Sequence, residues 1–410
     1  MIILLITFIS PSFAQNTKPK KVRFSGFLEY LNNTWIPADS LLFPGGSENW
    51  QNLSVVYNRL NFWWYPVKGL EFHAGMRNNF EFGPLIAQYN RQLEMLHQQL
   101  PQLNFPSTYA RLITTDNGLL NLTWDVASGN SYVLYSTFDR LYLKWTLNKF
   151  ELTVGRQRIN WGENLIWNPN DIFNAYNYFD FSYVERQGVD AVLMQFYTGD
   201  FSSLQLGVKV AKNRLTDNET QITAAAMYRF NKWNYDFQFF GGVMNKDVTA
   251  GLGWAGNIGG AGFTGEISWF RDRKNFKDTT DVFVGSIDVN YTFGNQIFLM
   301  GSVLYNSAGT TGNAGMGPLF TFNTVDAKSF SRARFDLFGQ IGYPATPLIN
   351  LNLASIFNPY DKSVYVGPSV TFSLTDNISL LLMGQLFFGN PGAEFGSIGQ
   401  MAYLDLKWSF

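Results

Sequence analysis

The last nine residues alternate strictly between apolar and polar side chains, and this pattern constrains the fold more than any other feature. Ala402, Leu404, Leu406, Trp408 and Phe410 are apolar, whereas the residues between them are polar or amphipathic. Two-residue alternation is typical of a β-strand whose two faces meet different surroundings. A soluble protein rarely exposes such an apolar edge, because unpaired edge strands aggregate. The pattern therefore favours the closing strand of a lipid-embedded barrel over the last strand of a soluble sandwich.

The composition agrees with a membrane protein built from strands. Charged residues make up only 15% of the chain and aromatic residues 17%, whereas ordinary soluble domains carry about 25% charged residues. A helical membrane protein would need apolar runs of about 20 residues, and none follows the N-terminus. Transmembrane strands interrupt their apolar residues with polar, inward-facing ones. The net charge of −1 gives no basic face for nucleic acid, so we expect no such partner.

The first fourteen residues are typical of a secretory signal peptide. An apolar stretch ends in Ser12-x-Ala14, which places small residues where a signal peptidase needs them, although no Lys or Arg precedes the stretch. We therefore expect residues 1–14 to be a signal peptide and residues 15–410 to form one domain. The chain has no cysteine, so disulfides and thiolate metal sites are excluded.

Strand-like stretches recur about every 20 residues and are joined alternately by short turns and longer loops. The short turns, one of which we expect at Asn231-Lys232, are rich in Asn, Asp and Gly, which supply the backbone angles of tight hairpins. Eight short turns and nine longer loops predict an all-β, transmembrane, antiparallel up-and-down β-barrel of 18 strands, with 16 as the second choice. This arrangement leaves both termini on the short-turn side.

Two connections are too long for this rhythm. Residues 83–130 form a long insert that begins with apolar residues at near-helical spacing, from Leu85 to Leu100. A helix here could fold into the lumen as a plug, cap the mouth, or lie outside as a surface flap. Residues 160–187 form a second long connection, which we expect to fold inward or to cap the barrel, because loops of this length are usually functional or disordered.

The end of the chain resembles the C-terminal signal of Gram-negative outer-membrane proteins, a terminal Phe with apolar residues at every second position before it. The residues that carry this resemblance are Leu404, Leu406, Trp408 and Phe410. The resemblance implies recognition by the barrel-insertion machinery and a location in the cell outer membrane. Outer-membrane lipid and lipopolysaccharide would then surround the barrel. No lipid-facing strand stands out as a subunit interface, so the oligomeric state stays open.

A second resemblance lies inside the chain. The stretch Gly155-Arg156-Gln157, continued by Trp161-Gly162-Glu163 and Asn168-Pro169, resembles porin-like outer-membrane families, including relatives of alginate-export channels of the Bacteroidetes type. It covers about 20 of the 410 residues. It implies a barrel with a conducting lumen and does not identify a solute.

Charged residues in and after this stretch are candidates for a pore constriction. An Arg on the lipid side of a strand costs about 2–4 kcal/mol at the bilayer midplane, so Arg156 and Arg158 should lie at the mouth, or at a bulge that turns them inward. In general porins the third outer loop folds inward and places acids opposite basic residues. We therefore expect Arg156, Arg158 and Arg186 to face Glu163 and Asp171, either as a selectivity constriction or as salt bridges that attach the loop to the wall.

Other charges fall on the inward positions of predicted strands, and both signs occur. This mixture argues against strong anion selectivity. The predicted lumen-lining residues are Glu71, Arg77, Arg140, Lys144, Lys209, Arg229, Glu266, Asp288, Asp336 and Asp405.

These features predict a channel for passive passage of small polar solutes. The alternative is a surface-assembly or secretion-associated barrel that binds partners through its loops and has a closed lumen. An enzyme is not expected, because the only histidines, His73 and His97, are not placed to activate a nucleophile. No cofactor or metal is predicted.

Overall fold

The computed structural model describes residues 21–38, 50–99, 106–175, 178, 187–215, 218–277, 280–315 and 326–410. The predicted signal peptide lies outside these residues. The described part consists of antiparallel strands and two helices, α1 (Pro84–Gln99) and α2 (Tyr109–Thr114). The strands are β1 (Val22–Ile36), β2 (Gln51–Trp64), β3 (Leu70–Phe82), β4 (Thr123–Ser128), β5 (Tyr132–Leu147), β6 (Phe150–Gln157), β7 (Val189–Gly199), β8 (Ser202–Lys212), β9 (Thr220–Lys232), β10 (Tyr235–Met244), β11 (Asp247–Ile258), β12 (Ala261–Asp272), β13 (Val282–Thr292), β14 (Phe298–Asn306), β15 (Phe335–Thr346), β16 (Ile349–Phe357), β17 (Val364–Thr375), β18 (Ile378–Phe388) and β19 (Gln400–Ser409).

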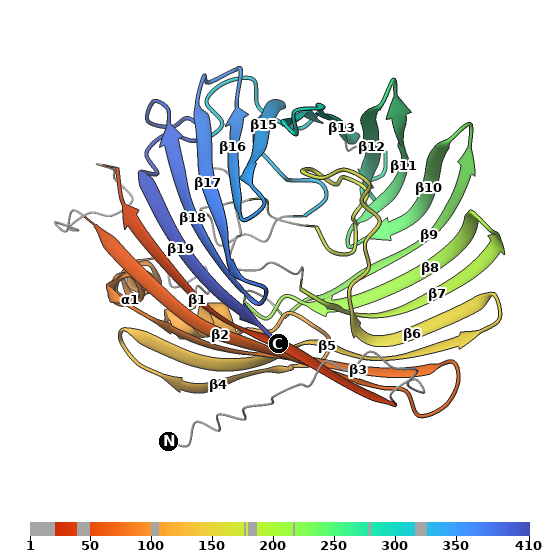
Figure 1. Cartoon of the computed structure of the whole chain (residues 1–410), viewed down its shortest axis with the longest axis horizontal. Helices are drawn as coiled ribbons and strands as arrows, with labels where there is room; N and C mark the ends of the chain where they lie inside the picture. The colour runs from red at the N-terminus through yellow and green to blue at the C-terminus, as the bar shows by residue number, and fades with distance from the viewer. Residues whose placement is uncertain are drawn as a thin grey trace.

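The strands form one closed barrel (Figure 1). Each strand pairs with its neighbours, and β19 pairs with both β18 and β1, which closes the ring. β4 is not a member of the ring, because β3 pairs directly with β5 and β4 pairs only with β5. The ring therefore has 18 strands, which confirms the first prediction and excludes 16.

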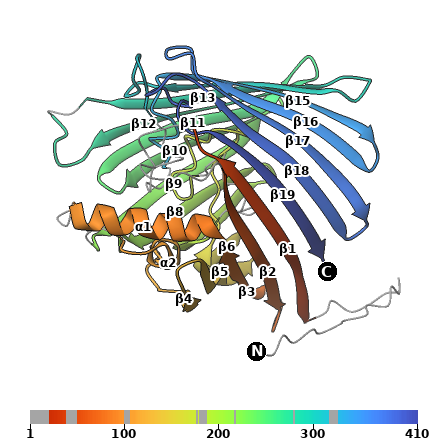
Figure 2. The ribbon, with the colours of Figure 1, turned by 90° about the vertical axis from the view of Figure 1, so that its left-hand side faces the viewer.

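The C-terminal strand closes the barrel through its backbone. Beyond the last paired residues of β19, Phe410 and Gly26 exchange two backbone hydrogen bonds of 2.9 Å. The Phe410 ring lies against Gly26, where a Cβ atom would come within 2.9 Å of the ring. A glycine is therefore needed on β1 to seat the terminal aromatic residue. Figure 2 shows the C-terminus beside β1, at the end of the barrel that carries the short turns.

The two faces of the barrel differ as the alternation predicts. On β8, Leu204, Leu206 and Val208 are between 37% and 46% exposed, whereas Ser203 and Gly207, on the opposite face of the strand, are buried. The same apolar exposure recurs on β13, β15 and β19. The outer face is therefore largely an apolar band suited to lipid, and most polar residues of the strands point inward. Among the described residues, no helix combines the length and the apolar character needed to cross a membrane.

Short connections of two to five residues join the strands at the end near the termini, from β2–β3 to β17–β18. In the β9–β10 turn, Trp233 and Asn234 both have a positive φ, 57° and 62°, as in the type I′ turns that favour two-residue hairpins. This turn lies two residues beyond the Asn231-Lys232 position that the sequence suggests. The longer loops lie at the opposite end of the barrel.

The long insert packs inside the barrel mouth in its described part. Ile86 of α1 and Tyr109 of α2 pack against Val133, on the inner face of β5. The Tyr109 hydroxyl donates to Glu81 on β3 at 2.7 Å. Both helices thus lie against the inner wall, and this part of the insert is not a surface flap.

The remainder of the insert completes the wall above β6, which has only 8 residues. β4 continues the edge of β5 where β6 has ended, since Thr123 is opposite Thr137 and Arg156 is opposite Leu141. Just before β4, Gly118 forms a bridge with Ala211 on β8. We call residues 116–128 the wall segment.

Candidate functional site

The connection between β6 and β7 crosses the interior and is the main feature of the lumen. We call residues 158–188 the inward loop. Figure 1 shows its yellow segment running from β6 across the interior toward β12. Its described residues include Trp161 and Phe173, both 0% exposed, which pack in the apolar cluster of the interior. These described residues of the loop therefore lie inside the barrel.

Glu266 on β12 binds the inward loop. The carboxylate is 0% exposed and accepts backbone hydrogen bonds from Asn164 and Asn170 at 2.8 Å, and a third from Glu163. The side-chain amide of Asn168 adds a bond of 3.3 Å. One buried carboxylate therefore meets four donors of the loop, which offsets the cost of burying its charge.

Neighbouring strands extend this attachment. Asp288 on β13 accepts from the Leu165 backbone at 2.9 Å, and Ser286 donates to the Trp167 carbonyl at 2.7 Å. On the other side, Gln238 donates to the Trp161 carbonyl at 2.7 Å. The loop is thus bound along β10, β12 and β13 by side chains that alternate with lipid-facing residues.

The predicted constriction residues do not all come together. Glu163 pairs with Arg229 on β9, with 2.5 Å between nitrogen and oxygen. Burial raises the pKa of Glu163, and the positive charge of Arg229 opposes this effect. Asp171 is buried in the inward loop and Arg158 is exposed at its start. Arg186 lies outside the described residues.

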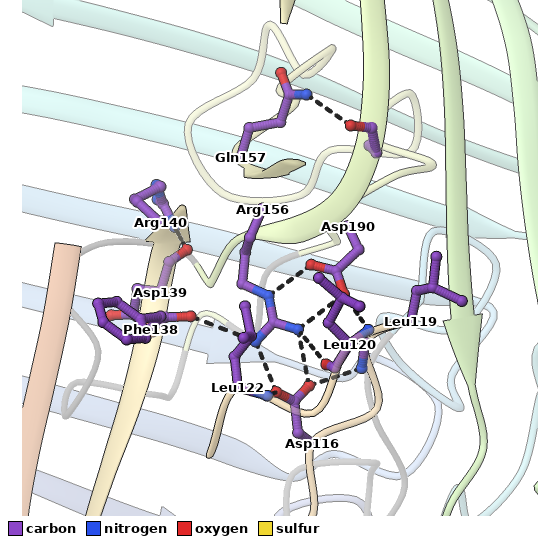
Figure 3. A network of polar contacts seen from close by, with 12 residues as sticks. Asp116, Leu119, Leu120, Leu122, Phe138, Asp139, Arg140, Arg156, Gln157 and Asp190 are labelled. Atoms are coloured by element: carbon purple, nitrogen blue, oxygen red, sulfur yellow. Dashed lines mark hydrogen bonds and ion pairs between the residues drawn. The ribbon is translucent and has the colours of Figure 1, made fainter. Parts of the chain in front are cut away.

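Arg156 has different partners from those expected. Gly155, with a φ of 119°, precedes it in a conformation that favours glycine. The guanidinium binds Asp190 on β7 through two hydrogen bonds of 2.7 and 2.9 Å, and Asp116 of the wall segment through bonds of 2.7 and 3.2 Å. Figure 3 shows Arg156 between the two carboxylates. The expectation that Arg156 faces Glu163 and Asp171 is therefore wrong. Arg156 instead forms salt bridges with two other acids, Asp116 and Asp190.

This network fixes the wall segment to the barrel. Arg156 also donates to the Leu120 carbonyl at 2.8 Å, and Asp190 accepts from the Leu120 backbone at 2.9 Å. Asp116 accepts from the backbones of Gly118 and Leu122 at 2.7 Å. Burial raises the pKa of Asp116, but the hydrogen bonds and charge of Arg156 outweigh it, and the pKa is lowered overall. Asp116 is a member that the residue pattern did not identify.

Most of the ten predicted lumen-lining residues occupy strand positions that alternate with apolar ones; Arg77, beside Asn78, and Arg140, beside Asp139, are the exceptions. Several of them are committed to structural contacts: Lys144 pairs with Glu151 at 2.9 Å, Tyr142 donates to Glu71 at 3.1 Å, and Lys209 donates to the Phe173 carbonyl at 2.8 Å. The buried members are Arg77, Arg140, Glu266, Asp288 and Asp336; Asp405 is half-buried on β19.

The inner wall has two chemically distinct halves. On β1–β5 it carries charges and aromatic rings, with Arg59 at 3.6 Å from Asp139 and Arg77 4.6 Å from the centre of the Tyr57 ring. On β10–β18 its polar groups, such as Gln238, Glu266 and Asp288, bind the inward loop, and buried rings such as Phe240 and Phe270 lie beside them.

A polar cavity of about 400 Å³ lies between the wall segment, the inward loop and strands β3, β5 and β8–β10. Both signs of charge line it. Its charged residues are Asp116, Asp139, Arg156, Asp190, Lys209, Lys212 and Asp326.

Comparisons with known proteins show what the fold is similar to. No protein-family model matches the sequence, and no curated protein matches it. The solved structure of OprD from Pseudomonas aeruginosa is similar over 94% of this chain and 95% of that chain, with 9% identity and a TM-score of 0.56. OccAB2 from Acinetobacter baumannii gives 9% identity, 94% and 98% coverage and a TM-score of 0.57. OccK7 (OpdD) from P. aeruginosa is similar over 95% of this chain and 99% of that chain, with 10% identity and a TM-score of 0.56. The chain thus has the porin-like fold of outer-membrane β-barrels, and at these identities the likeness shows the fold alone.

Proposed function

We propose that this protein is a porin-like channel of the cell outer membrane, through which small polar solutes pass passively. The observation that carries the proposal is the inward loop, which is bound to one half of the wall by Glu266 and leaves a polar cavity against the charged half. A cavity of about 400 Å³ matches a small solute, since small-molecule sites measure about 300–1,000 Å³.

The constriction in this proposal consists of residues of the inward loop and the wall opposite. Glu163 with Arg229, and Asp171 near Lys209, place opposite charges in the interior. Such pairs orient polar solutes and weaken any preference for one sign of ion. Arg156 contributes by holding the wall segment. The resemblance of residues 155–171 to relatives of alginate-export channels extends the proposal to kinship with that group.

A second candidate is a surface-assembly or secretion-associated barrel with a closed lumen. The burial of Arg59 and Arg77, at 2% and 6% exposure, favours it, because side chains that line an open aqueous path are normally wet. We give the channel precedence because the wall near these arginines carries charges that a closed apolar core would not need.

Liposome swelling distinguishes the two. Purified protein in liposomes should admit small uncharged solutes such as glycerol and arabinose, and exclude large oligosaccharides, because the inward loop narrows the path. The control is the same liposomes without protein. Swelling no faster than this control, for every solute, would contradict the channel and favour the closed barrel.

A further inference from the structure

A row of polar side chains lies on the outer face of the barrel. Asn78 on β3 donates to Asn58 on β2 at 2.9 Å and accepts from Ser136 on β5 at 2.6 Å. Asn58 is opposite Asn78, and Asn78 is opposite Ser136, in the strand register. The three residues therefore form one continuous line across three strands.

This row lies within the apolar band and not at its edge. On β3, Asn78 comes between Met76 and the exposed Phe80, and on β2, Asn58 comes between Val56 and the exposed Leu60. Because every second residue of a strand shares a face, the polar groups interrupt lipid-facing stripes. Trp64 and Phe82 mark the two ends of these stripes.

A second polar network on the same side adjoins the row. Asn32 on β1 donates to Ser54 on β2 at 2.9 Å, and Asn52 donates to Asn32 at 3.1 Å and to Thr34 at 3.3 Å. These residues alternate with inward-facing ones such as Leu31 and Val55. Eight polar residues lie on the outer face of β1, β2, β3 and β5, and we call this surface the polar outer face. Its members are Tyr30, Asn32, Thr34, Asn52, Ser54, Asn58, Asn78 and Ser136.

Side-chain amides are rare on the rest of the described outer surface. Among the described residues of β6–β18, no Asn or Gln shares the lipid-facing side with the exposed apolar residues, and on β19 only Gln400, the first residue of the strand, does so. A shallow groove of about 820 Å³ borders the polar outer face on the β19 side, where Asn32 and Thr34 meet Ala402 and Leu404. The small residues Gly384 and Ala402 line this groove, and small residues allow close approach within a membrane.

We propose that the polar outer face is a subunit interface against which a second copy of this chain packs in the membrane. Amides and hydroxyls both donate and accept, and none of the eight groups is charged, so the same surface on another copy is complementary to it. Lipid tails offer no hydrogen-bond partner, and the row of Asn58, Asn78 and Ser136 lies within the apolar band, away from the headgroups. The side-chain amide nitrogen of Asn58 donates to no described residue, so it is available to a partner. This inference goes beyond the proposed channel, since a monomer would conduct equally well.

Site-directed cross-linking tests the interface directly, because a chain without cysteine accepts single thiols. We compare Asn78→Cys with Ile287→Cys, a control on β13, which lies across the ring from β3 and is 45% exposed. In outer membranes treated with a short bis-maleimide, Asn78→Cys should give a product of twice the chain mass and Ile287→Cys should not. A product of another mass, equal dimer from both variants, or no product would overturn the proposal.

A second variant tests the role of the amides. Asn58→Leu with Asn78→Leu makes the outer stripe apolar and should leave the barrel intact, which its migration on unheated gels checks. Association measured by native mass in mild detergent should weaken about tenfold relative to the unaltered protein. A monomeric unaltered protein, or unchanged association in a folded double variant, would contradict the proposed role.

Discussion

Replacing Glu266 by alanine should free the inward loop and raise single-channel conductance. The carboxylate accepts from three backbone N–H groups of the loop and from Asn168. Each buried donor left without a partner costs about 1–3 kcal/mol, so the loop should leave this wall and widen the path. The measurement is single-channel current in planar bilayers, where the variant should show larger and noisier openings.

Two matched variants show whether the effect is specific. Glu266→Gln keeps one carbonyl acceptor of similar size and should give an intermediate result. Glu219→Ala removes an exposed carboxylate whose pair with Lys246 lies at the surface, and it should change nothing. If Glu266→Ala folds and conducts like the unaltered protein, the loop does not depend on this carboxylate.

Replacing Arg156 by leucine should detach the wall segment and lower barrel stability. Two buried carboxylates, Asp116 and Asp190, would then share no cation, and removing one partner of a buried ion pair costs about 3–5 kcal/mol. The variant should unfold at a lower temperature on heat-modifiable gels and become open to protease between residues 116 and 122. Arg271→Leu is the control, because its pair with Asp281 is exposed and should be worth less than about 1 kcal/mol.

The unfolding temperatures of the unaltered protein and of Arg156→Leu should differ by an amount that depends on pH, because Asp116 titrates. The pKa of Asp116 is lower in the folded state than in the unfolded chain, where it is about 3.9. The contacts of Asp116 therefore stabilise the fold fully at a pH above the unfolded pKa. This stabilisation is lost as the pH falls through the pKa of the folded state. The gap in unfolding temperature between the unaltered protein and Arg156→Leu should therefore narrow in acid. A gap that is constant from neutral to strongly acidic pH would contradict this assignment.

The barrel could be predicted from the sequence because alternation and turn residues are local signals. Strand number followed from the turns, and the closing role of Phe410 from the last nine residues. β4 escaped prediction because it is short and its place depends on β6 ending early at Gln157. The β9–β10 turn was misplaced by two residues because Trp233 adopts a positive φ that its residue type does not favour.

The site was harder to predict because its contacts join distant segments. Arg156 was expected at a constriction, but its partner Asp116 lies 40 residues earlier in a different loop, and no spacing rule connects the two. Glu266 was expected to line the lumen. Its binding of loop amides could not be foreseen, since those donors are backbone groups that carry no residue signature. The polar outer face became visible only when the register aligned Asn58, Asn78 and Ser136.

Single-channel recording of the unaltered, refolded protein tests the central claim most directly. The channel account predicts discrete, stable open currents in planar bilayers, with ion selectivity that is weak because both signs of charge line the interior. A folded barrel, verified by its heat-modifiable migration, that never gives open currents would contradict the account and indicate a closed lumen.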